Sequence, residues 1–322
     1  MNQTCKQLAA PLMTILLVLC MCAAAELTGN QEILFPEIAA IAAGALLRKK
    51  AAWNTDGLHI LGMIAAGAFA GVLIVRFLPL PHWMQMSTAF LLALLMLRGS
   101  RCGFAPAISA IVLPVMLGTE TLVYPAAAIC LTGAILLLRK AAVRLGVTEP
   151  FAFTPQPRMQ RRDLTDLLLC WTAGTVLIAI AMGTGFRYLA APPLLVAFTE
   201  CRKPDSGMQK HPVAAVGLMT ACAAAGSLMR MLALRLTLPL FPAAGITILL
   251  VILLMRRTGL WLPPAAALSI LAFLIPAAAL PMFAVQICIG AALLVGTAVL
   301  HTKLSSAIAR RSGAGTPHTQ WR

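Results

Sequence analysis

The 322-residue sequence predicts an all-α polytopic membrane protein with about twelve transmembrane helices, which form two parallel six-helix repeats that include short or broken helices. Three observations predict this fold class. Hydrophobic residues make up 60% of the chain and charged residues only 11%, so too few polar side chains exist to cover a soluble domain. Apolar segments fill most of the length. The two halves also share glycine, proline and arginine positions in the same order.

Glycine, proline and charged clusters divide the apolar sequence into candidate spans. In the first half these cover roughly residues 7–27, 33–47, 57–78, 83–98, 103–118 and 122–139. In the second half they cover roughly residues 165–184, 187–200, 212–234, 238–255, 260–276 and 279–301. The first span ends in three alanines, as a cleavable signal peptide does, but the matching span in the second half favours a retained helix.

A polar stretch with several prolines separates the two sets of spans. We expect a first repeat at 1–142, a basic cytoplasmic linker at 143–163, a second repeat at 164–302 and a basic cytoplasmic tail at 303–322. The two repeats correspond residue by residue at two offsets. At an offset of 158, Leu91 matches Leu249, Arg98 matches Arg256 and Pro106 matches Pro264. At an offset of 155, Gly62 matches Gly217 and Gly71 matches Gly226.

The lysine and arginine residues indicate which side of the membrane each loop faces, because cytoplasmic loops carry an excess of both. With a cytoplasmic N-terminus, all but four of the 25 lie in cytoplasmic segments. The exceptions lie in or near the outward ends of helices and are Arg76, Arg187, Arg230 and Arg235. The asymmetry predicts a multi-pass protein of the bacterial inner membrane with both termini in the cytoplasm.

Four spans are short or interrupted by proline, and they occupy matching places in the two repeats: 33–47 with 187–200, and 103–118 with 260–276. A helix that begins at a proline inside the membrane directs its positive N-terminal end at a solute, which favours an anion. The alternative is that these are ordinary short helices capped by loops. The candidate binding residues in these spans are Pro36, Glu37, Pro106, Pro192, Pro193, Thr199, Pro263 and Pro264.

Ionisable residues near the membrane interior are functional candidates because burying them is costly. Glu37 directly follows Pro36 in a short span. Arg76 and Arg230 occupy nearly equivalent places in the two repeats, so we expect them to form an anion-attracting vestibule. The alternative for both arginines is that they extend to the outer interface, and Glu37 has the alternative of an interfacial position without a role in transport.

Other chemistry is not indicated. The basic residues form short clusters rather than a stripe with interleaved aromatics, which argues against nucleic acid. The nine cysteines include no CxxC pair and no histidine at metal-ligand spacing, so we predict no metal and no cofactor. The chain has no GxxxxGK[ST], HExxH or GxSxG motif and no identifiable nucleophile with a base, so we do not expect an enzyme.

The second half resembles the HPP family of small membrane proteins. The resemblance extends over about 90 residues, from Ala191-Pro192-Pro193 through His211-Pro212 and Gly217 to Leu262-Pro263-Pro264-Ala265-Ala266, which is similar to the family's His-Pro-Pro-Ala-Gly block. Leu262 replaces the histidine and Ala266 the glycine, so no role of that histidine carries over. Relatives in photosynthetic organisms are linked to nitrite transport, which implies a small-anion transporter. The first half is also similar to the membrane half of fusaric-acid-resistance and aromatic-acid exporters.

The leading hypothesis is therefore a secondary transporter of small anions, either an inorganic anion such as nitrite or a small carboxylate, with its site between the two repeats. The expected partners are the lipid bilayer and the anionic solute. The alternative is a non-transporting membrane subunit or assembly protein that binds partner helices through small residues. Gly67 and Gly71 have the GxxxG spacing, which is compatible with a homo-oligomer.

Overall fold

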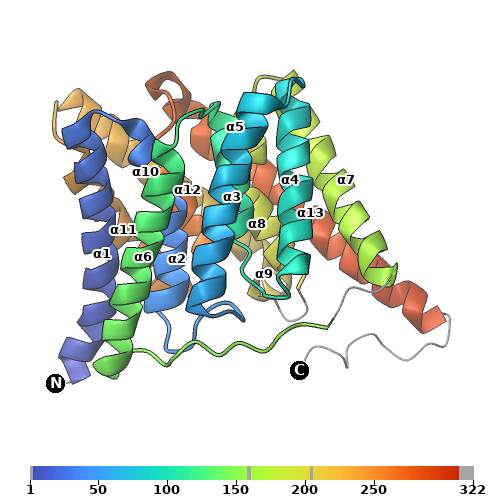
Figure 1. Cartoon of the computed structure of the whole chain (residues 1–322), viewed down its shortest axis with the longest axis horizontal. Helices are drawn as coiled ribbons and strands as arrows, with labels where there is room; N and C mark the ends of the chain where they lie inside the picture. The colour runs from blue at the N-terminus through green and yellow to red at the C-terminus, as the bar shows by residue number, and fades with distance from the viewer. Residues whose placement is uncertain (1–2, 158–160, 204–205, 312–322) are drawn as a thin grey trace.

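A computed structural model of the chain describes residues 3–157, 161–203 and 206–311, and within these ranges it is helical and contains no strand. The helices form a bundle whose members run across its height (Figure 1). The start of α1 (Gln3–Thr28), the segment after α6 (Val123–Arg144) and the end of α13 (Leu280–Arg311) all lie at the lower face in Figure 1. We call this the linker face, and we define it by residues 47–56, 100–106 and 145–157.

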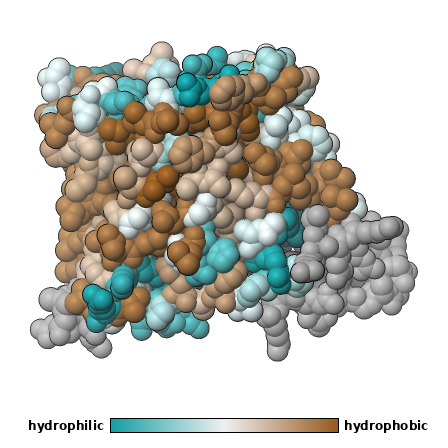
Figure 2. All heavy atoms as spheres, viewed as in Figure 1, coloured by the Kyte–Doolittle hydropathy of each residue, from teal (hydrophilic) through white to brown (hydrophobic). Residues whose placement is uncertain are grey.

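Within the described parts of the chain, seven helices are long and apolar enough to cross a membrane. On the side of the bundle that Figure 2 shows, an apolar belt lies between two bands of polar residues, as expected of a protein surrounded by lipid. The fold is therefore that of a multi-pass helical membrane protein. The seven helices are α1, α3 (Gly57–Phe77), α6, α7 (Arg161–Gly183), α10 (Pro212–Arg235), α11 (Leu240–Thr258) and α13.

Each predicted span contains a helix, but five of these twelve helices are not among the seven that are long and apolar enough to cross a membrane. α4 (His82–Gly99) has the length and is less apolar. The other four are α2 (Glu37–Leu46), α5 (Ala107–Leu117), α8 (Pro192–Cys201) and α12 (Pro263–Leu271), with 10, 11, 10 and 9 residues. At 1.5 Å per residue each extends about 15 Å, half of a hydrocarbon core. The connecting elements are the short helix α9 (Gly207–Lys210) and the 3-10 turns η1 (Gln31–Ile33), η2 (Arg187–Ala190) and η3 (Ala277–Ala279).

The short helices are shorter than the predicted spans because each begins at a proline. Pro36 and Pro106 stand directly before α2 and α5, and Pro192 and Pro263 are the first residues of α8 and α12. Proline lacks the N–H that would continue a helix backwards, and its ring disfavours helical backbone in the residue before it. The prediction that these segments are short and begin at proline is confirmed.

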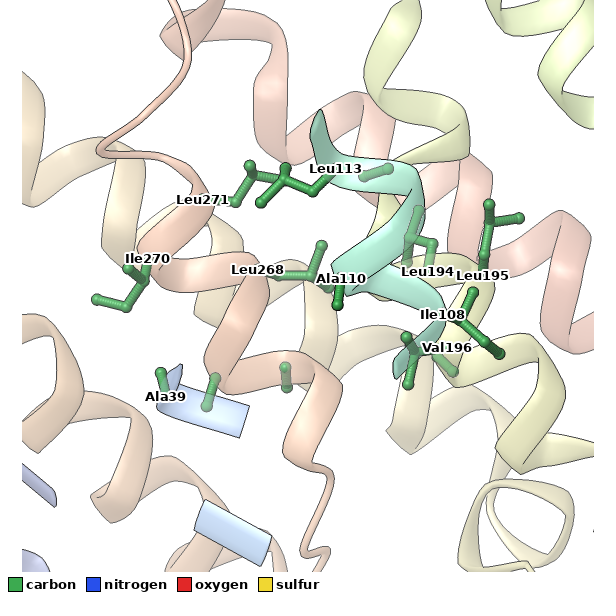
Figure 3. Packing of buried hydrophobic residues seen from close by; sticks show 14 of the residues in the cluster. Ala39, Ile108, Ala110, Leu113, Leu194, Leu195, Val196, Leu268, Ile270 and Leu271 are labelled. Atoms are coloured by element: carbon green, nitrogen blue, oxygen red, sulfur yellow. The ribbon is translucent and has the colours of Figure 1, made fainter. Parts of the chain in front are cut away.

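The four short helices form the centre of the bundle. α2 and α12 are buried along their whole length. α2 packs against α12, α12 against α8, and α8 against α5. Figure 3 shows Leu113 of α5, Leu194 of α8 and Leu268 of α12 in this region, where apolar side chains fill the space between the helices. The outer helices therefore enclose a dry core of helices that are too short to span the membrane.

Two glycines allow outer helices to lie close to the short ones. A Cβ atom at Gly71 on α3 would lie 2.5 Å from Cγ of Pro114 on α5. A Cβ atom at Gly226 on α10 would lie 2.8 Å from the carbonyl carbon of Ser269 on α12. Neither position has room for a methyl group, so these residues determine how closely α3 approaches α5 and α10 approaches α12.

α3 begins at a defined cap. The Asp56 carboxylate accepts a hydrogen bond from the His59 N–H at 2.9 Å, and its other oxygen lies 2.9 Å from His59 Nδ1. Slight burial raises the pKa of Asp56, but the hydrogen bonds from the backbone and ring of His59 outweigh it and leave the pKa below its usual value. The carboxylate therefore stabilises the start of the helix in its charged form.

The linker crosses the linker face as an extended strap. Asn54 and Thr154 exchange two hydrogen bonds, at 2.7 and 2.8 Å. Arg101 and Gln156 form a second reciprocal pair, at 2.5 and 2.9 Å. α6 continues to Arg144 and α7 begins at Arg161, so the helices extend two residues into the start and three residues into the end of the predicted 143–163 linker. Residues 158–160 of the linker and 312–322 of the predicted basic tail lie outside the described residues.

Candidate functional site

A polar pocket of about 400 Å³ opens at the linker face between the two halves of the chain. It lies beneath the start of α12 and beside the end of α8, and the loop after α2 forms its third wall. A pocket of this size holds a small solute. Its lining residues are Arg48, Ala52, Glu200, Lys203, Ser206, Gly207, Met208, Gly259, Leu260, Trp261, Leu262 and Pro263.

Among the described residues that line the pocket, two side chains are cationic and one is anionic. Arg48 is exposed and forms no ion pair with another described residue. Lys203 donates from Nζ to the Gly103 carbonyl at 3.0 Å. Glu200 accepts a hydrogen bond from Nε1 of Trp53, at 2.6 Å, so a neutral donor satisfies its carboxylate. The pocket is left with an excess of positive charge, which favours an anion.

The same residues connect the two halves of the chain. Trp53 and Gly103 belong to the first half, whereas Glu200 and Lys203 belong to the second. The Trp53 ring meets the Phe104 ring edge-on, with the centroids 5.3 Å apart, which holds the indole in place. Farther along the same face, Arg98 of α4 lies 3.5 Å from the Asp166 carboxylate of α7. These contacts join the two halves of the chain at and near the linker face.

The prolines that the sequence singled out are all buried at the starts of the short helices: Pro36, Pro106, Pro192, Pro193, Pro263 and Pro264. Of these only Pro263 lines the pocket. Figure 3 shows that Ile108 near the start of α5 lies beside Val196 of α8, and that Ala39 near the start of α2 lies against α12. Apolar side chains thus fill the space between the short helices.

The expectation that these helix ends present free N–H groups to a solute is wrong for this conformation. The N–H of Ile38 donates to the Phe35 carbonyl at 2.9 Å, and the N–H of Leu194 donates to the Ala191 carbonyl at 2.8 Å. The N–H groups of Ile108 and Ala265 make the equivalent bonds at the starts of α5 and α12, to the carbonyls of Ala105 and Leu262. The residues before each proline supply carbonyl acceptors, so the donors are already occupied. The positive charge available to an anion comes from Arg48 and Lys203.

Glu37, at the start of α2, is 1% exposed. The nearest donors to its carboxyl group are the Ser109 hydroxyl and its own backbone N–H. Neither reaches normal hydrogen-bond geometry, so both carboxyl oxygens and the Ser109 hydroxyl lack a partner among the described residues. Glu37 is therefore buried in the core of the bundle, and the interfacial alternative for it is wrong.

Arg76 and Arg230 occupy different environments, so they do not form a common vestibule. Arg76 is exposed near the end of α3, as expected of a side chain that extends to the interface. Arg230 is 6% exposed, and its Nη1 donates to the carbonyls of Ala272, at 2.6 Å, and Ile275. Its cation lies at the negative end of α12, where it satisfies carbonyl groups that the helix leaves free.

Arg139 holds the end of α2 in the same way, which the sequence did not indicate because Arg139 and Lys140 read as a loop cluster. It is 2% exposed, and its Nη1 donates to the Ala45 carbonyl. Its Nη2 donates to the Glu149 carbonyl at 2.6 Å, and its guanidinium lies 4.3 Å from the centre of the Phe151 ring. Arg139 thus joins the end of α2 to the linker.

Near the end of α8, Thr199 and Glu200 differ in their contacts. The Thr199 hydroxyl bonds back to the Val196 carbonyl of its own helix at 2.8 Å. Its predicted binding role receives no support from that geometry. Glu200, which the sequence placed in a solvated loop, lines the pocket and bonds to Trp53. The position of Glu200 at the end of a predicted short span was the only feature of the sequence that indicated a role for this residue.

No protein-family model matches this chain, and no curated protein and no solved structure resembles it significantly. Within the part of the chain that the structure describes, no three histidine, cysteine, aspartate or glutamate side chains gather to hold a metal ion. The functional argument therefore rests on the pocket, its charges and the helices around it.

Proposed function

We propose that the protein is a secondary transporter of small anions, with its site between two six-helix repeats. The observation that carries the proposal is the pocket at the linker face, which takes Arg48 from the first half and Lys203 from the second. A site made by both halves changes shape whenever one half moves against the other, as alternating access requires. The resemblance to the HPP family suggests nitrite or a related anion as the substrate.

The order of the helices supports the two repeats. After α1 come η1, α2, α3, α4, α5 and α6, and after α7 come η2, α8, α10, α11, α12 and α13 in the same order of long and short elements. The second half adds the short elements α9 and η3, which have no counterpart in the first half. α1 packs against α11, and α7, the counterpart of α1, packs against α4, the counterpart of α11. Such reciprocal packing is expected if an axis along the membrane normal relates the two halves.

One pair of residues at each of these interfaces supports the same relation. A Cβ atom at Gly245 of α11 would lie 2.7 Å from Cδ2 of Leu19 on α1. A Cβ atom at Gly174 of α7 would lie 2.9 Å from Cδ1 of Phe90 on α4. Leu19 and Gly174 correspond at an offset of 155, and Phe90 lies about one helical turn from Ser87, the counterpart of Gly245 at the offset of 158 that relates α4 to α11. Both interfaces thus pack a glycine of the second half against a large residue of the first half.

The positions of the chain ends support twelve passages with both termini in the cytoplasm. The start of α1 and the end of α13 lie at the same face, which an even number of passages requires (Figure 1). The described linker face carries the basic residues Arg48, Lys49, Lys50 and Arg101, and Lys203 lines the pocket that opens there. By the positive-inside rule this face is cytoplasmic, and the inner membrane of a bacterium is the proposed location.

In the proposed cycle the described conformation receives the anion from the cytoplasmic side. Arg48 and Lys203 attract it, and the start of α12 forms the inner end of the pocket. The packed side chains between the short helices block further passage. Passage to the other side requires the halves to shift, which breaks the Trp53–Glu200 and Lys203–Gly103 contacts that connect them.

Flux into proteoliposomes tests the proposal. Purified protein is reconstituted, and uptake of nitrite, nitrate and benzoate is compared with uptake by protein-free vesicles. We expect saturable uptake of at least one anion, with competition by its unlabelled form. If none of the three is carried above the protein-free rate, the anion proposal is wrong.

A non-transporting membrane subunit has one observation in its favour. An apolar groove of about 490 Å³ lies between α3 and α4 and is lined by side chains such as Leu73, Phe77 and Leu92. A partner helix fits such a surface, although lipid chains also fill grooves of this kind. Absence of flux together with a stoichiometric partner that copurifies in mild detergent would favour this function.

A further inference from the structure

The carboxyl group of Glu37 lies in the core of the bundle and does not line the binding pocket. It is separated from the pocket by the length of α2, because Arg48 lies beyond the other end of that helix. The anion site and Glu37 are therefore different places on the same short helix.

The surroundings of Glu37 contain no cation that would stabilise a carboxylate. The helices packed against α2 are α1, α6 and α12. Their buried titratable side chains are Cys22 on α1 and Tyr124 and Arg139 on α6, and α12 has none. Arg139 bonds at the opposite end of α2, to the Ala45 carbonyl. The Tyr124 hydroxyl lies near Glu37 but donates to the Ala110 carbonyl at 3.1 Å.

The protonation state of Glu37 follows from this inventory. A buried carboxylate without a counter-ion or hydrogen-bond partner is more costly than a neutral carboxyl group. The positive end of α2 favours the charged form, but a helix end compensates only part of the cost of burying a charge. Burial without a counter-ion therefore favours the protonated form of Glu37 in the described conformation, and a change that exposed the carboxyl group to water or to a cation would favour release of the proton.

Resting on the proposed transport function, we propose that Glu37 binds and releases a proton during each cycle, so that the anion moves together with a proton. The step is a proton transfer between the carboxyl group and water, and no other bond forms or breaks. When Pro36 is laid over Pro192, the proline at the start of the matching short helix, Glu37 corresponds to Pro193, so the second half contributes no equivalent carboxyl group. A monovalent anion then crosses with one proton, and the transport is electroneutral.

Infrared difference spectroscopy tests the proton site without any transported solute. The purified wild type, the Glu37→Gln variant and the Glu120→Gln variant are compared as the pH is raised. Glu120 is an exposed carboxylate and serves as the matched control. We expect a carbonyl stretching band of a buried protonated carboxyl group in the wild type and in Glu120→Gln, and its loss in Glu37→Gln. A wild-type spectrum without a band that depends on Glu37 would overturn the proposal.

Flux measurements in the same variants test the coupling. We expect a pH gradient, acidic on the side of uptake, to accelerate wild-type uptake of nitrate several-fold, and a potassium-diffusion potential to leave it unchanged. In Glu37→Gln the ratio of uptake with and without the gradient falls to unity, while Glu120→Gln retains the wild-type ratio. Wild-type uptake that ignores the gradient removes the coupling and leaves the transport function intact. Absence of wild-type uptake of nitrate, nitrite and benzoate instead removes the transport function and with it the coupling, and the infrared band alone then decides whether Glu37 holds a proton.

Discussion

The close approach of α10 to α12 depends on Gly226, and replacing it by alanine tests the packing of the short helices. The added Cβ would lie 2.8 Å from the carbonyl carbon of Ser269 and 3.0 Å from its Cα, and closer still to its oxygen. Carbon atoms pack at about 3.5–4.0 Å, so the helices must separate by about 1 Å. Overpacking of this kind costs about 1–3 kcal/mol, and the better helix propensity of alanine returns up to about 1 kcal/mol. We expect a net loss of about 1–2 kcal/mol in the free energy of unfolding.

Gly217 provides the matched control on the same helix, because nothing lies within 4 Å of a Cβ atom added there. Gly217→Ala is expected to leave the free energy of unfolding unchanged or raise it by about 0.5–1 kcal/mol. The measurement is unfolding of both purified variants in mixed micelles by titration with a denaturing detergent. Equal shifts of the two variants would refute the close packing of α10 against α12. Gly71→Ala and Gly62→Ala form the corresponding pair on α3.

Three further predictions concern the contacts that hold the short helices and the linker face. Arg230→Met leaves carbonyl groups at the end of α12 without a donor, so it is expected to lower the free energy of unfolding by about 1–3 kcal/mol. The control is Arg76→Met at an exposed position, which is expected to change the free energy of unfolding by less than about 0.5 kcal/mol in the same titration. In a double-mutant cycle, Trp53→Phe and Glu200→Gln are expected to show a coupling energy of about 1–2 kcal/mol, and additive effects would contradict the hydrogen bond between them. Asp56→Ala removes a helix cap and is expected to lower the thermal transition at neutral pH. Because the pKa of Asp56 is lowered in the folded protein, its stabilisation is present above the unfolded-state pKa of about 4 and is lost as the pH falls through the folded-state value, so wild type and variant should converge in acid.

Local features of the sequence were enough to locate the helices. Apolar runs and prolines fall where the structure has its helices, because hydropathy and the missing N–H of proline act on neighbouring residues. The lengths of the short helices were less predictable. Residues 33–36 are as apolar as those that follow, and only the packing around Phe35 and Pro36 shows that the helix begins at Glu37.

The candidate site depends on contacts between distant residues, which one sequence does not contain. Trp53 and Glu200 are 147 residues apart, and Lys203 and Gly103 are 100 apart, so their pairing follows from the fold. The starts of the short helices were expected to bind the anion through free N–H groups. In the structure these N–H groups donate to the carbonyls of the residues that precede the prolines, and the sequence does not show these hydrogen bonds. The sequence singled out Glu37, because an ionisable residue in an apolar span is rare enough to be noticed.

The central claim is that Arg48 and Lys203 attract a small anion into a pocket between the two halves. The most direct test is the uptake of the carried anion by the double variant Arg48→Gln/Lys203→Gln. Its control is Lys50→Gln/Arg257→Gln, which removes the same charge from exposed positions that do not line the pocket. We predict that the pocket variant raises the KM for the anion at least about tenfold, equivalent to about 1.4 kcal/mol of lost binding, and that the control retains the wild-type KM. Equal KM values for the two double variants would contradict the account.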